Sequence, residues 1–224
     1  MELIMEQFPI VIQSLNVGFL QTLKLFFVTL LGALPLGLII AFGSMSHFRP
    51  LKYITNIIVW VVRGTPLMIQ MLIIYYFPGL VLHKQIWGGG ETGRFLAASL
   101  SFVLNYACYF SEIYRGGIES MPVGQYEAAK ILGYNKVQTF FRIILPQVIK
   151  RILPSITNEV ITLVKDTSLA FVVAVAEMFT IAKQIASAQT TMMPFVIAAI
   201  FYYVFNLIVA VVMQKVEKSM NYYR

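Results

Sequence analysis

Five apolar segments, each close to the length of a membrane-spanning helix, run through this chain and limit what it can fold into. A spanning α-helix needs about 20 residues that are mostly apolar. The five segments are residues 20–45, 53–80, 95–111, 152–176 and 194–213. We therefore expect an all-α, polytopic membrane protein with about five transmembrane helices, and one transmembrane domain over residues 1–224.

The composition excludes other classes of protein. Charged residues make up 12% of the chain and apolar residues 58%, whereas soluble domains carry about a quarter charged residues. This is too little charge for a soluble globule or a disordered chain. The net charge of +7 would suggest nucleic acid in a soluble protein. In a membrane protein it indicates basic cytoplasmic loops, so we expect membrane lipid and no nucleic acid as a partner.

The basic residues are unequally distributed between the loops. One set of loops and the C-terminal tail carry Arg49, Lys52, Arg115, Lys130, Lys136, Arg142, Lys150, Arg151, Lys215, Lys218 and Arg224. The opposite loops carry Lys84, Arg94 and Lys183, beside an N-terminus with Glu2 and Glu6. Because cytoplasmic loops are enriched in Lys and Arg, we expect the C-terminus in the cytoplasm and the N-terminus outside. Residues 1–19 are amphipathic and are predicted to lie along a membrane face.

Few residues suggest metal, redox or nucleotide chemistry. Cys108 cannot form an intrachain disulfide and lies in an apolar stretch, where we expect it to pack. His47 and His83 are far apart and show no metal-ligand spacing. Residues 88–95 have the glycine spacing of a phosphate-binding loop, but Arg94 and Phe95 replace its Lys and Ser/Thr. We therefore expect a glycine-rich turn there, and no metal, cofactor or catalytic residue in this chain.

Two of the predicted spans contain a break. Arg63, Gly64, Thr65 and Pro66 interrupt the second span, since proline has no N–H for the helix ladder. The fourth span is interrupted by Lys165, Asp166, Thr167 and Ser168, whose hydroxyl groups can satisfy freed backbone groups. We assign both groups a gating or structural role.

The loop at residues 116–150 predicts two short amphipathic helices. Pro122 suits a helix start, Gly133 suits a C-cap with positive φ, and a second helix is expected from about Asn135. Tyr126, Ala129 and Leu132 form an apolar stripe on the first helix, with Ile131 beside it. From composition alone, these helices either pack on the membrane face of their own chain or insert into a groove of a cytosolic partner.

A sequence motif in this loop resembles the EAA loop of ABC importer permeases. Its fixed positions are Glu127, Ala128, Ala129, Gly133, Ile143, Leu145 and Pro146, at the spacing of the family pattern. In that family the loop is the coupling helix that docks into the ATPase subunit. The resemblance therefore assigns ATPase coupling to these residues and to the adjoining Gln125.

Further motifs are similar to the polar amino acid uptake family, in its histidine/glutamine/arginine permease group. They are residues 63–67 with Gln70, residues 75–76, 112–118, 124–125 and 145–147, and Asn158 followed by residues 165–169. The resemblance implies a permease of a prokaryotic cell membrane that moves a polar amino acid into the cytoplasm by alternating access. It also implies an ATPase dimer that holds ATP and Mg²⁺, an external solute-binding protein, and a second permease chain, identical or closely related.

Polar residues inside the spans are the candidates for substrate contact, because a charge within a span costs at least ~2.5 kcal/mol. Glu159, Thr162 and Asp166 share a helix face, with Asn158 adjacent. A cationic substrate side chain needs a desolvated carboxylate, for which we select Glu159; pairing with Arg63 or Lys165 is the alternative. The remaining candidates, which face the same cavity or form inter-helix hydrogen bonds, are Gln70, Ser101 and Asn105. We therefore expect basic amino acids as substrates.

Two other functions are open to a chain with intramembrane acids. A secondary amino acid carrier would use these acids for ion coupling, but it has no use for an ATPase-docking loop. An intramembrane enzyme would need a nucleophile with a base, or a metal cluster, and the sequence shows neither.

Overall fold

Helices account for the secondary structure of the computed structural model, which describes the backbone of residues 2–220 and the side chains of residues 8–220. The side chains of Glu2 and Glu6, and Arg224, which enter the charge argument above, lie outside the described part. The helices are α1 (Glu2–Ser44), α2 (Arg49–Arg63), α3 (Leu67–Leu80), α4 (Gly90–Glu119), α5 (Val123–Ile131), α6 (Lys136–Thr139), a π-helical turn η1 (Phe140–Ile144), α7 (Leu145–Asp166), a 3₁₀ segment η2 (Thr167–Val173), α8 (Met178–Gln189) and α9 (Met193–Ser219).

Three of these helices are long and apolar enough to cross a membrane by themselves. They are Phe8–Ser44, Gly90–Glu119 and Met193–Ser219. Two bent pairs bring the number of candidate spans to as many as five: α2 with α3, bent by 107°, and Lys136–Val173 with α8, bent by 57°. The five predicted segments therefore correspond to three straight helices and two broken ones.

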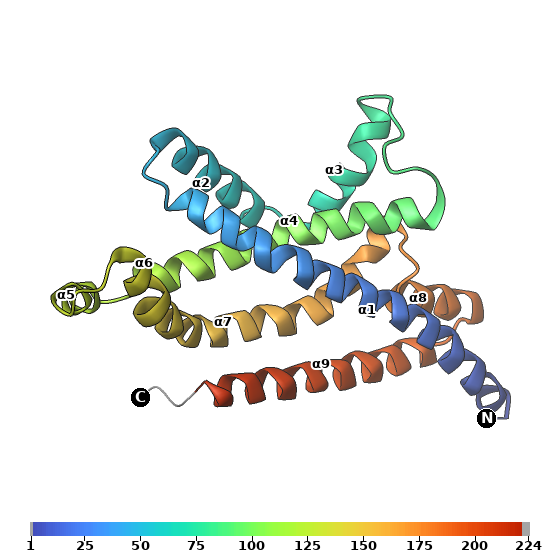
Figure 1. Cartoon of the computed structure of the whole chain (residues 1–224). Helices are drawn as coiled ribbons and strands as arrows, with labels where there is room; N and C mark the ends of the chain where they lie inside the picture. The colour runs from blue at the N-terminus through green and yellow to red at the C-terminus, as the bar shows by residue number, and fades with distance from the viewer. Residues whose placement is uncertain (1, 221–224) are drawn as a thin grey trace.

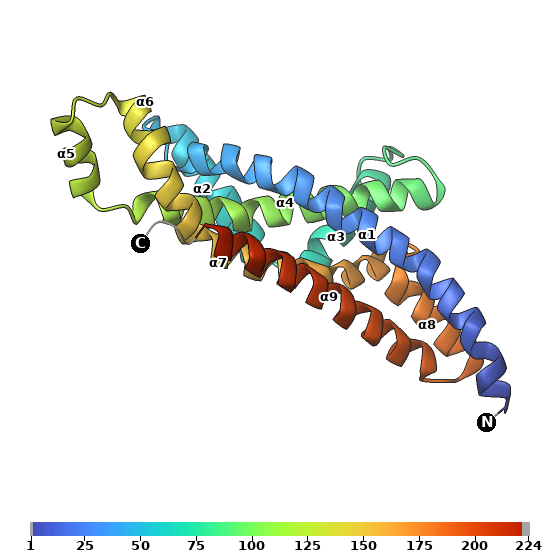
Figure 2. The ribbon, with the colours of Figure 1, turned by 60° about the horizontal axis from the view of Figure 1, so that its bottom comes forward.

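The long helices α1, α4, α7 and α9 run along one long axis of the molecule, and different short elements lie at its two ends (Figures 1 and 2). α5 and α6 lie at one end, where α9 also finishes, and the start of α1 lies with α8 at the opposite end (Figures 1 and 2). α1 packs along α4, and α7 packs against both α4 and α9. The loop with α5 and α6 therefore lies at the opposite end of the molecule from α8 and the start of α1 (Figures 1 and 2).

Glycines let α1 and α4 approach closely. A Cβ atom at Gly37 would lie 2.9 Å from both the Ala107 carbonyl oxygen and the Phe110 Cβ. A Cβ at Gly32 would lie 2.8 Å from a methyl group of Val103. Small residues at helix contacts are typical of membrane proteins, because close packing replaces the hydrophobic effect as the force between helices. Fully buried Phe110 lies in the same core.

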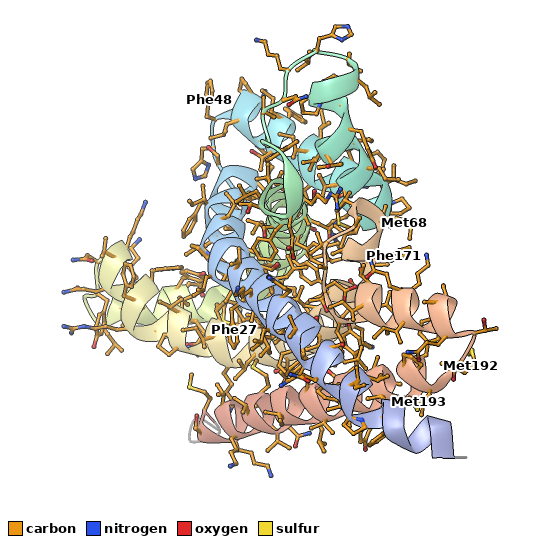
Figure 3. The ribbon with its side chains drawn as sticks, turned by 90° about the vertical axis from the view of Figure 1, so that its right-hand side faces the viewer. Phe27, Phe48, Met68, Phe171, Met192 and Met193 are labelled. Atoms are coloured by element: carbon orange, nitrogen blue, oxygen red, sulfur yellow. The ribbon has the colours of Figure 1, made fainter. Side chains whose placement is uncertain are left out.

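Large apolar side chains cover the outside of the long helices. Phe27 on α1, labelled in Figure 3, is 54% exposed, and Leu31 on the same helix is 76% exposed. α9 adds a row of such residues: Val196, Ile200, Tyr203, Val204, Leu207, Ile208, Val211 and Val212. Such a surface is stable in lipid and unfavourable in water, as the sequence predicted for spanning helices.

One sequence-based expectation about the end that carries α8 is wrong. Residues 1–19 were expected as a separate amphipathic segment, but from Glu2 they belong to the continuous helix α1. Val11 and Leu15 are buried against Met178 and Ala182 of α8, a helix that the sequence did not predict. The packing of α8 against α1 gives these residues protein contacts in place of a membrane surface.

The glycine-rich turn is shorter than predicted. Gly88 and Gly90 have positive φ angles of 67° and 75°, as a tight turn requires. α4 then begins at Gly90, so most of residues 88–95 are helical. The predicted fourth span also begins earlier than expected, since α7 starts at Leu145.

The close contact of α1 with α4 predicts the effect of a single added methyl group. Gly37→Ala should destabilise the protein by about 1–3 kcal/mol, since α4 backbone has to move away. Gly116→Ala is the matched control, because nothing lies within 4 Å of a Cβ at that helical position. Thermal unfolding of the purified protein in detergent should show a lower melting temperature for Gly37→Ala alone. Equal melting temperatures of the two variants would contradict the packing.

Candidate functional site

The first broken span turns sharply between α2 and α3. α2 ends at Arg63, Gly64 is its C-cap, and α3 begins after Pro66. The missing N–H of Pro66 ends the helical ladder, and the axis turns by 107°. The structure thus confirms the predicted break and places it at an exposed turn between two helical halves.

Side chains satisfy the carbonyl groups that this break leaves free. The Thr65 hydroxyl donates to the Val61 carbonyl at 2.9 Å. The Gln70 amide nitrogen donates to the Val62 carbonyl at 2.7 Å and to the Thr65 carbonyl at 3.0 Å. Both side chains therefore serve the break, since an unpaired carbonyl within a membrane costs several kcal/mol.

The second broken span changes at Thr167 from the α-helix α7 to the 3₁₀ segment η2, and its 57° bend comes later, between Val173 and Met178. The Thr167 hydroxyl donates to the Val164 carbonyl at 2.7 Å, and the Ser168 hydroxyl donates to the Lys165 carbonyl at 2.8 Å. Lys165 is exposed and Thr167 is fully buried. The predicted break at residues 165–168 is therefore a change of helix type without a bend, and the bend of this span follows at residues 174–177. The hydroxyl groups of Thr167 and Ser168 bind backbone carbonyls as expected.

Two consecutive residues of α4 each form a hydrogen bond with one of the two broken spans. The Asn105 amide nitrogen donates to the Gln70 Oε1 of α3 at 3.0 Å. The Tyr106 hydroxyl donates to the Asp166 Oδ2 at the end of α7, at 2.8 Å. α4 is unbroken from Gly90 to Glu119, so it holds both irregular segments against one straight helix.

The three substrate-contact residues predicted on α7 precede the second break. Glu159 and Thr162 are half-buried and Asn158 is exposed. Glu159 makes no ion pair within 4.0 Å and no hydrogen bond among residues 8–220. The charges of Arg63 and Asp166 lie within electrostatic range of it. Its carboxylate is therefore partly desolvated and has no short-range partner in the described part of the chain.

Ser101 and Asn105, which the sequence left as cavity or inter-helix residues, make contacts inside the protein. Ser101 is fully buried, and its hydroxyl donates to the Ala97 carbonyl of its own helix at 2.8 Å. Asn105 is buried and bonded to Gln70. The alternative of inter-helix hydrogen bonding therefore describes Asn105, which binds Gln70 of α3, whereas the hydroxyl of Ser101 binds its own helix.

A row of alternating charges on α2 and α4 was not predicted. The Arg115 Nε and Nη2 donate to the two carboxylate oxygens of Glu112, at 3.1 Å and 2.7 Å, and its Nη1 donates to Glu119 at 2.9 Å. Arg63, at the first break, lies 3.5 Å from the same Glu112. The sequence signal was the Glu112-x-x-Arg115-x-x-x-Glu119 spacing, which places the three residues on one helix face.

A hollow of about 470 Å³ adjoins Arg63 at the first break. Trp60, Gly64 and Tyr109 form the rest of its lining. The Arg63 guanidinium lies over the Tyr109 ring, 5.0 Å from its centroid, a cation–π distance. The hollow therefore combines aromatic walls with one positive charge.

The loop with the EAA motif ends its first helix as predicted. Gly133 has a φ of 79°. The Tyr134 N–H donates to the Ala129 carbonyl, and the Gly133 N–H to the Lys130 carbonyl, at 3.0 and 3.1 Å. These two bonds form a Schellman motif. α6 then begins with Asn135 as its N-cap in a capping box with Gln138, as the expected second helix.

The outer surface of this loop is apolar and exposed. Ala129 of the predicted stripe is buried, whereas Leu132 and Ile131 are 73% and 86% exposed. The other exposed apolar residues are Val123, Tyr126, Val137 and Phe141. Glu127 and Ala128 are also exposed. Most of the stripe is therefore not covered by the described part of this chain.

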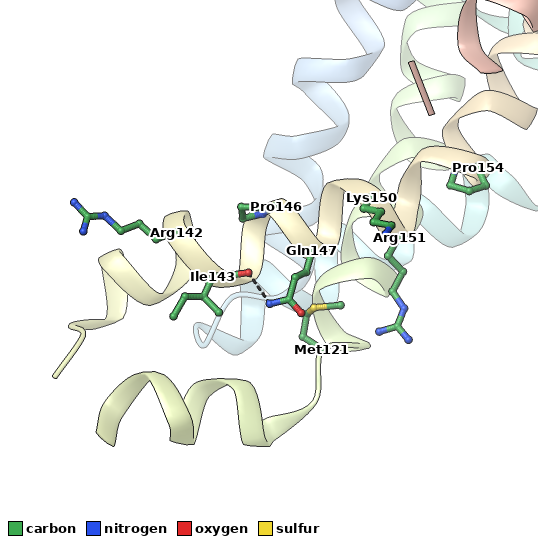
Figure 4. A pocket seen from close by; sticks show the side chains of 8 residues that line it. All are labelled: Met121, Arg142, Ile143, Pro146, Gln147, Lys150, Arg151 and Pro154. Atoms are coloured by element: carbon green, nitrogen blue, oxygen red, sulfur yellow. Dashed lines mark hydrogen bonds between the residues drawn. The ribbon is translucent and has the colours of Figure 1, made fainter. Parts of the chain in front are cut away.

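The base of the loop is fixed to the helices. Met121 packs with Ile144, Val148 and Ile152. Gln147 donates to the Ile143 carbonyl at 2.8 Å, as Figure 4 shows, and to the Gln125 Oε1 at 3.3 Å. A hollow of about 670 Å³ adjoins this base and is lined in part by Pro146 and Arg151. Leu145 and Pro146 of the motif open α7, directly after the π-helical turn.

Sequence reasoning also missed a buried carboxylate. Glu177 is fully buried, caps the N-terminus of α8, and accepts hydrogen bonds from the Phe179 N–H at 2.7 Å and the Thr180 N–H at 2.6 Å. It also accepts from the Thr180 hydroxyl at 2.8 Å and from the Tyr202 hydroxyl of α9 at 3.0 Å. The available signal was an acidic residue directly after a long apolar run.

Comparisons with known proteins give a consistent family. The model for "binding-protein-dependent transport system inner membrane component" matches residues 33–222. The chain is similar to the L-cystine transport system permease TcyB of Bacillus subtilis, with 34% identity over 93% of this chain and 87% of that protein. It is equally similar to the arginine transport system permease ArtQ of B. subtilis, with 34% identity over 96% and 94% of the two chains. A crystal structure of an amino acid ABC transporter with histidines has a TM-score of 0.85 and 31% identity, covering 97% of both chains.

The bond between Tyr106 and Asp166 predicts a measurable coupling. Tyr106→Phe should destabilise the protein by about 1–3 kcal/mol, because the Asp166 carboxylate loses its donor. Combined with Asp166→Asn, the two changes should cost less than their sum. Thermal unfolding in detergent measures both. Tyr75→Phe is the control, since no hydrogen bond of its hydroxyl is found in residues 8–220. Additive effects of the Tyr106 and Asp166 changes would contradict the bond.

Proposed function

We propose that this chain, which belongs to the family of binding-protein-dependent transport system inner membrane components and is a permease subunit of an amino acid ABC importer, prefers basic amino acids. The observation that carries the proposal is the half-buried carboxylate of Glu159 on α7, which has no ion pair within 4.0 Å among residues 8–220. A cationic substrate side chain would neutralise a charge that is costly to keep within a membrane.

The neighbours of Glu159 support a contact with a polar substrate. Thr162 lies one turn further along α7, and Asn158 adds an exposed amide. Both can donate to or accept from a substrate without losing a bond seen in the structure. Gln70 and Asn105, by contrast, are occupied by the break between α2 and α3. We therefore place the side-chain specificity on α7.

The loop α5–α6 is proposed to dock into a cytosolic ATPase dimer, which holds ATP and Mg²⁺. Its exposed apolar residues, including Ile131, Leu132 and Val137, need a partner surface. Gln125 and Gln147 connect the loop to α7, which carries Glu159. A movement of the docked loop would thus reach the substrate residues through one helix and shift the population between inward-open and outward-open states.

The remaining partners follow from the same proposal. The loop end of the molecule faces the cytoplasm of a prokaryotic cell, with the C-terminus on that side and the N-terminus outside. A second permease chain, identical or closely related, completes the pathway, and an external solute-binding protein delivers the amino acid. No chemical step occurs in this chain.

The specificity proposal is tested with Glu159→Gln, which removes the charge at constant size. In the purified permease–ATPase complex, the variant should bind arginine about tenfold or more weakly, as expected for loss of a hydrogen bond to a charged group. Citrulline, the neutral analogue of arginine, should bind unchanged. Isothermal titration calorimetry gives both dissociation constants. Glu91→Gln, on the exposed first turn of α4, is the control. An equal loss for both ligands would remove Glu159 from the specificity role.

The docking proposal is tested with Gly133→Ala. An alanine at a φ of 79° strains the Schellman turn by about 1–2 kcal/mol, which should lower substrate-stimulated ATP hydrolysis of the reconstituted importer. Gly79→Ala is the control, since its φ is not positive and nothing lies within 4 Å of a Cβ there. Full stimulation in the Gly133 variant, and in a Glu127→Ala variant, would contradict docking through this loop.

A further inference from the structure

Arg63 lies at the end of α2, where the first broken span changes direction. Its side chain is 41% exposed, and it lines the hollow of about 470 Å³ with Trp60, Gly64 and Tyr109. This volume lies in the range of about 300–1,000 Å³ that is typical of small-molecule sites. A guanidinium has five N–H donors in a fixed planar fork. Among residues 8–220, none of these donors of Arg63 makes a hydrogen bond.

Arg63 has one nearby carboxylate, and that carboxylate is already bound elsewhere. Glu112 lies 3.5 Å from Arg63, which is longer than the 2.7–2.9 Å of a charge-assisted hydrogen bond. Arg115 holds the same carboxylate at 2.7 Å and 3.1 Å, using both of its oxygens. Glu112 therefore stabilises the positive charge of Arg63 but does not occupy the N–H donors of its guanidinium, which remain available to a second anion.

The position of Arg63 complements that of Glu159. The two side chains lie within electrostatic range of each other on different helices, without forming an ion pair within 4.0 Å. A free amino acid carries a carboxylate at one end and, when basic, a cation at the other. An arginine fork and a separate carboxylate, both partly desolvated and neither paired by a short bond, present the two opposite charges that such a molecule requires.

We propose that Arg63 binds the α-carboxylate of the transported amino acid through its guanidinium fork. Arg63 rests beside Glu112 when no substrate is present and turns to the substrate carboxylate when the amino acid enters the hollow. Arg115 keeps Glu112 neutralised in both situations. This proposal rests on the proposed function as an amino acid permease, but it does not depend on the preference for basic side chains.

Three ligands that differ by one group each test the proposal in the permease–ATPase complex without a binding protein. They are arginine, its neutral analogue citrulline, and agmatine, which is arginine without the carboxylate. Arg63→Gln should weaken arginine and citrulline by about tenfold or more and leave agmatine unchanged. Arg49→Gln, the same change at the other end of α2, should leave all three dissociation constants as they are. Calorimetry on monodisperse protein measures the constants.

The outcomes separate this proposal from the function proposed above. Equal weakening of agmatine and arginine by Arg63→Gln would show a structural role and overturn the carboxylate contact, as would unchanged binding of arginine and citrulline. In the unmodified complex, agmatine that binds as tightly as arginine would also overturn it, even if the Arg63 variant does not fold. Glu159→Gln gives the independent result: equal losses of arginine and citrulline there end the basic preference and leave the Arg63 assignment standing.

Discussion

The arrangement of this protein depends on two hydrogen bonds made by neighbouring residues of one straight helix. Asn105 and Tyr106 of α4 bind Gln70 and Asp166, which belong to the two broken spans. Broken helices are costly in a bilayer unless their backbone groups find partners within the protein. The two bonds tie both broken spans to α4, and these spans carry Arg63 and Glu159. Gln70, Asn105, Tyr106 and Asp166 therefore hold the structure together, whereas Arg63 and Glu159 remain available to a substrate.

The sequence predicted those features whose signals are local. Pro66 revealed the break between α2 and α3, and Gly133 revealed the end of α5, because proline and positive-φ glycine constrain their own backbone. At residues 165–168 the sequence predicted a break, but the helix only changes there to a 3₁₀ segment, and the bend follows at residues 174–177. The partner of Gln70 is 35 residues away in the chain, and no local pattern specifies it. Gln70 and Asn105 were therefore recognised as polar, while their pairing became visible only in three dimensions.

The same distinction explains the unpredicted elements at the two ends. α8 is short, and Glu177 that caps it also accepts a bond from Tyr202, 25 residues later. The π-helical turn before Leu145 arises where the EAA loop joins α7, and the pattern of apolar residues does not distinguish it from an α-helix. At Ser101, a serine in an apolar span indicated a polar contact, but its hydroxyl binds its own helix. These differences arise where tertiary contacts or a local backbone partner decide the outcome.

The length of α1 has a consequence for the shape of the protein in its membrane. At about 1.5 Å per residue, its 43 residues extend about 65 Å, roughly twice the 30 Å of a hydrocarbon core. An upright α1 is far too long for lipid to cover. Val11 and Leu15, near its start, are covered by α8 and by Ile197 of α9 instead. The protein thus covers only one face of α1 at that end, while Ile10 and Val17 stay 64% and 60% exposed. A helix longer than the hydrocarbon core is accommodated by tilting, so the bare face of α1 favours an inclined helix over an upright one.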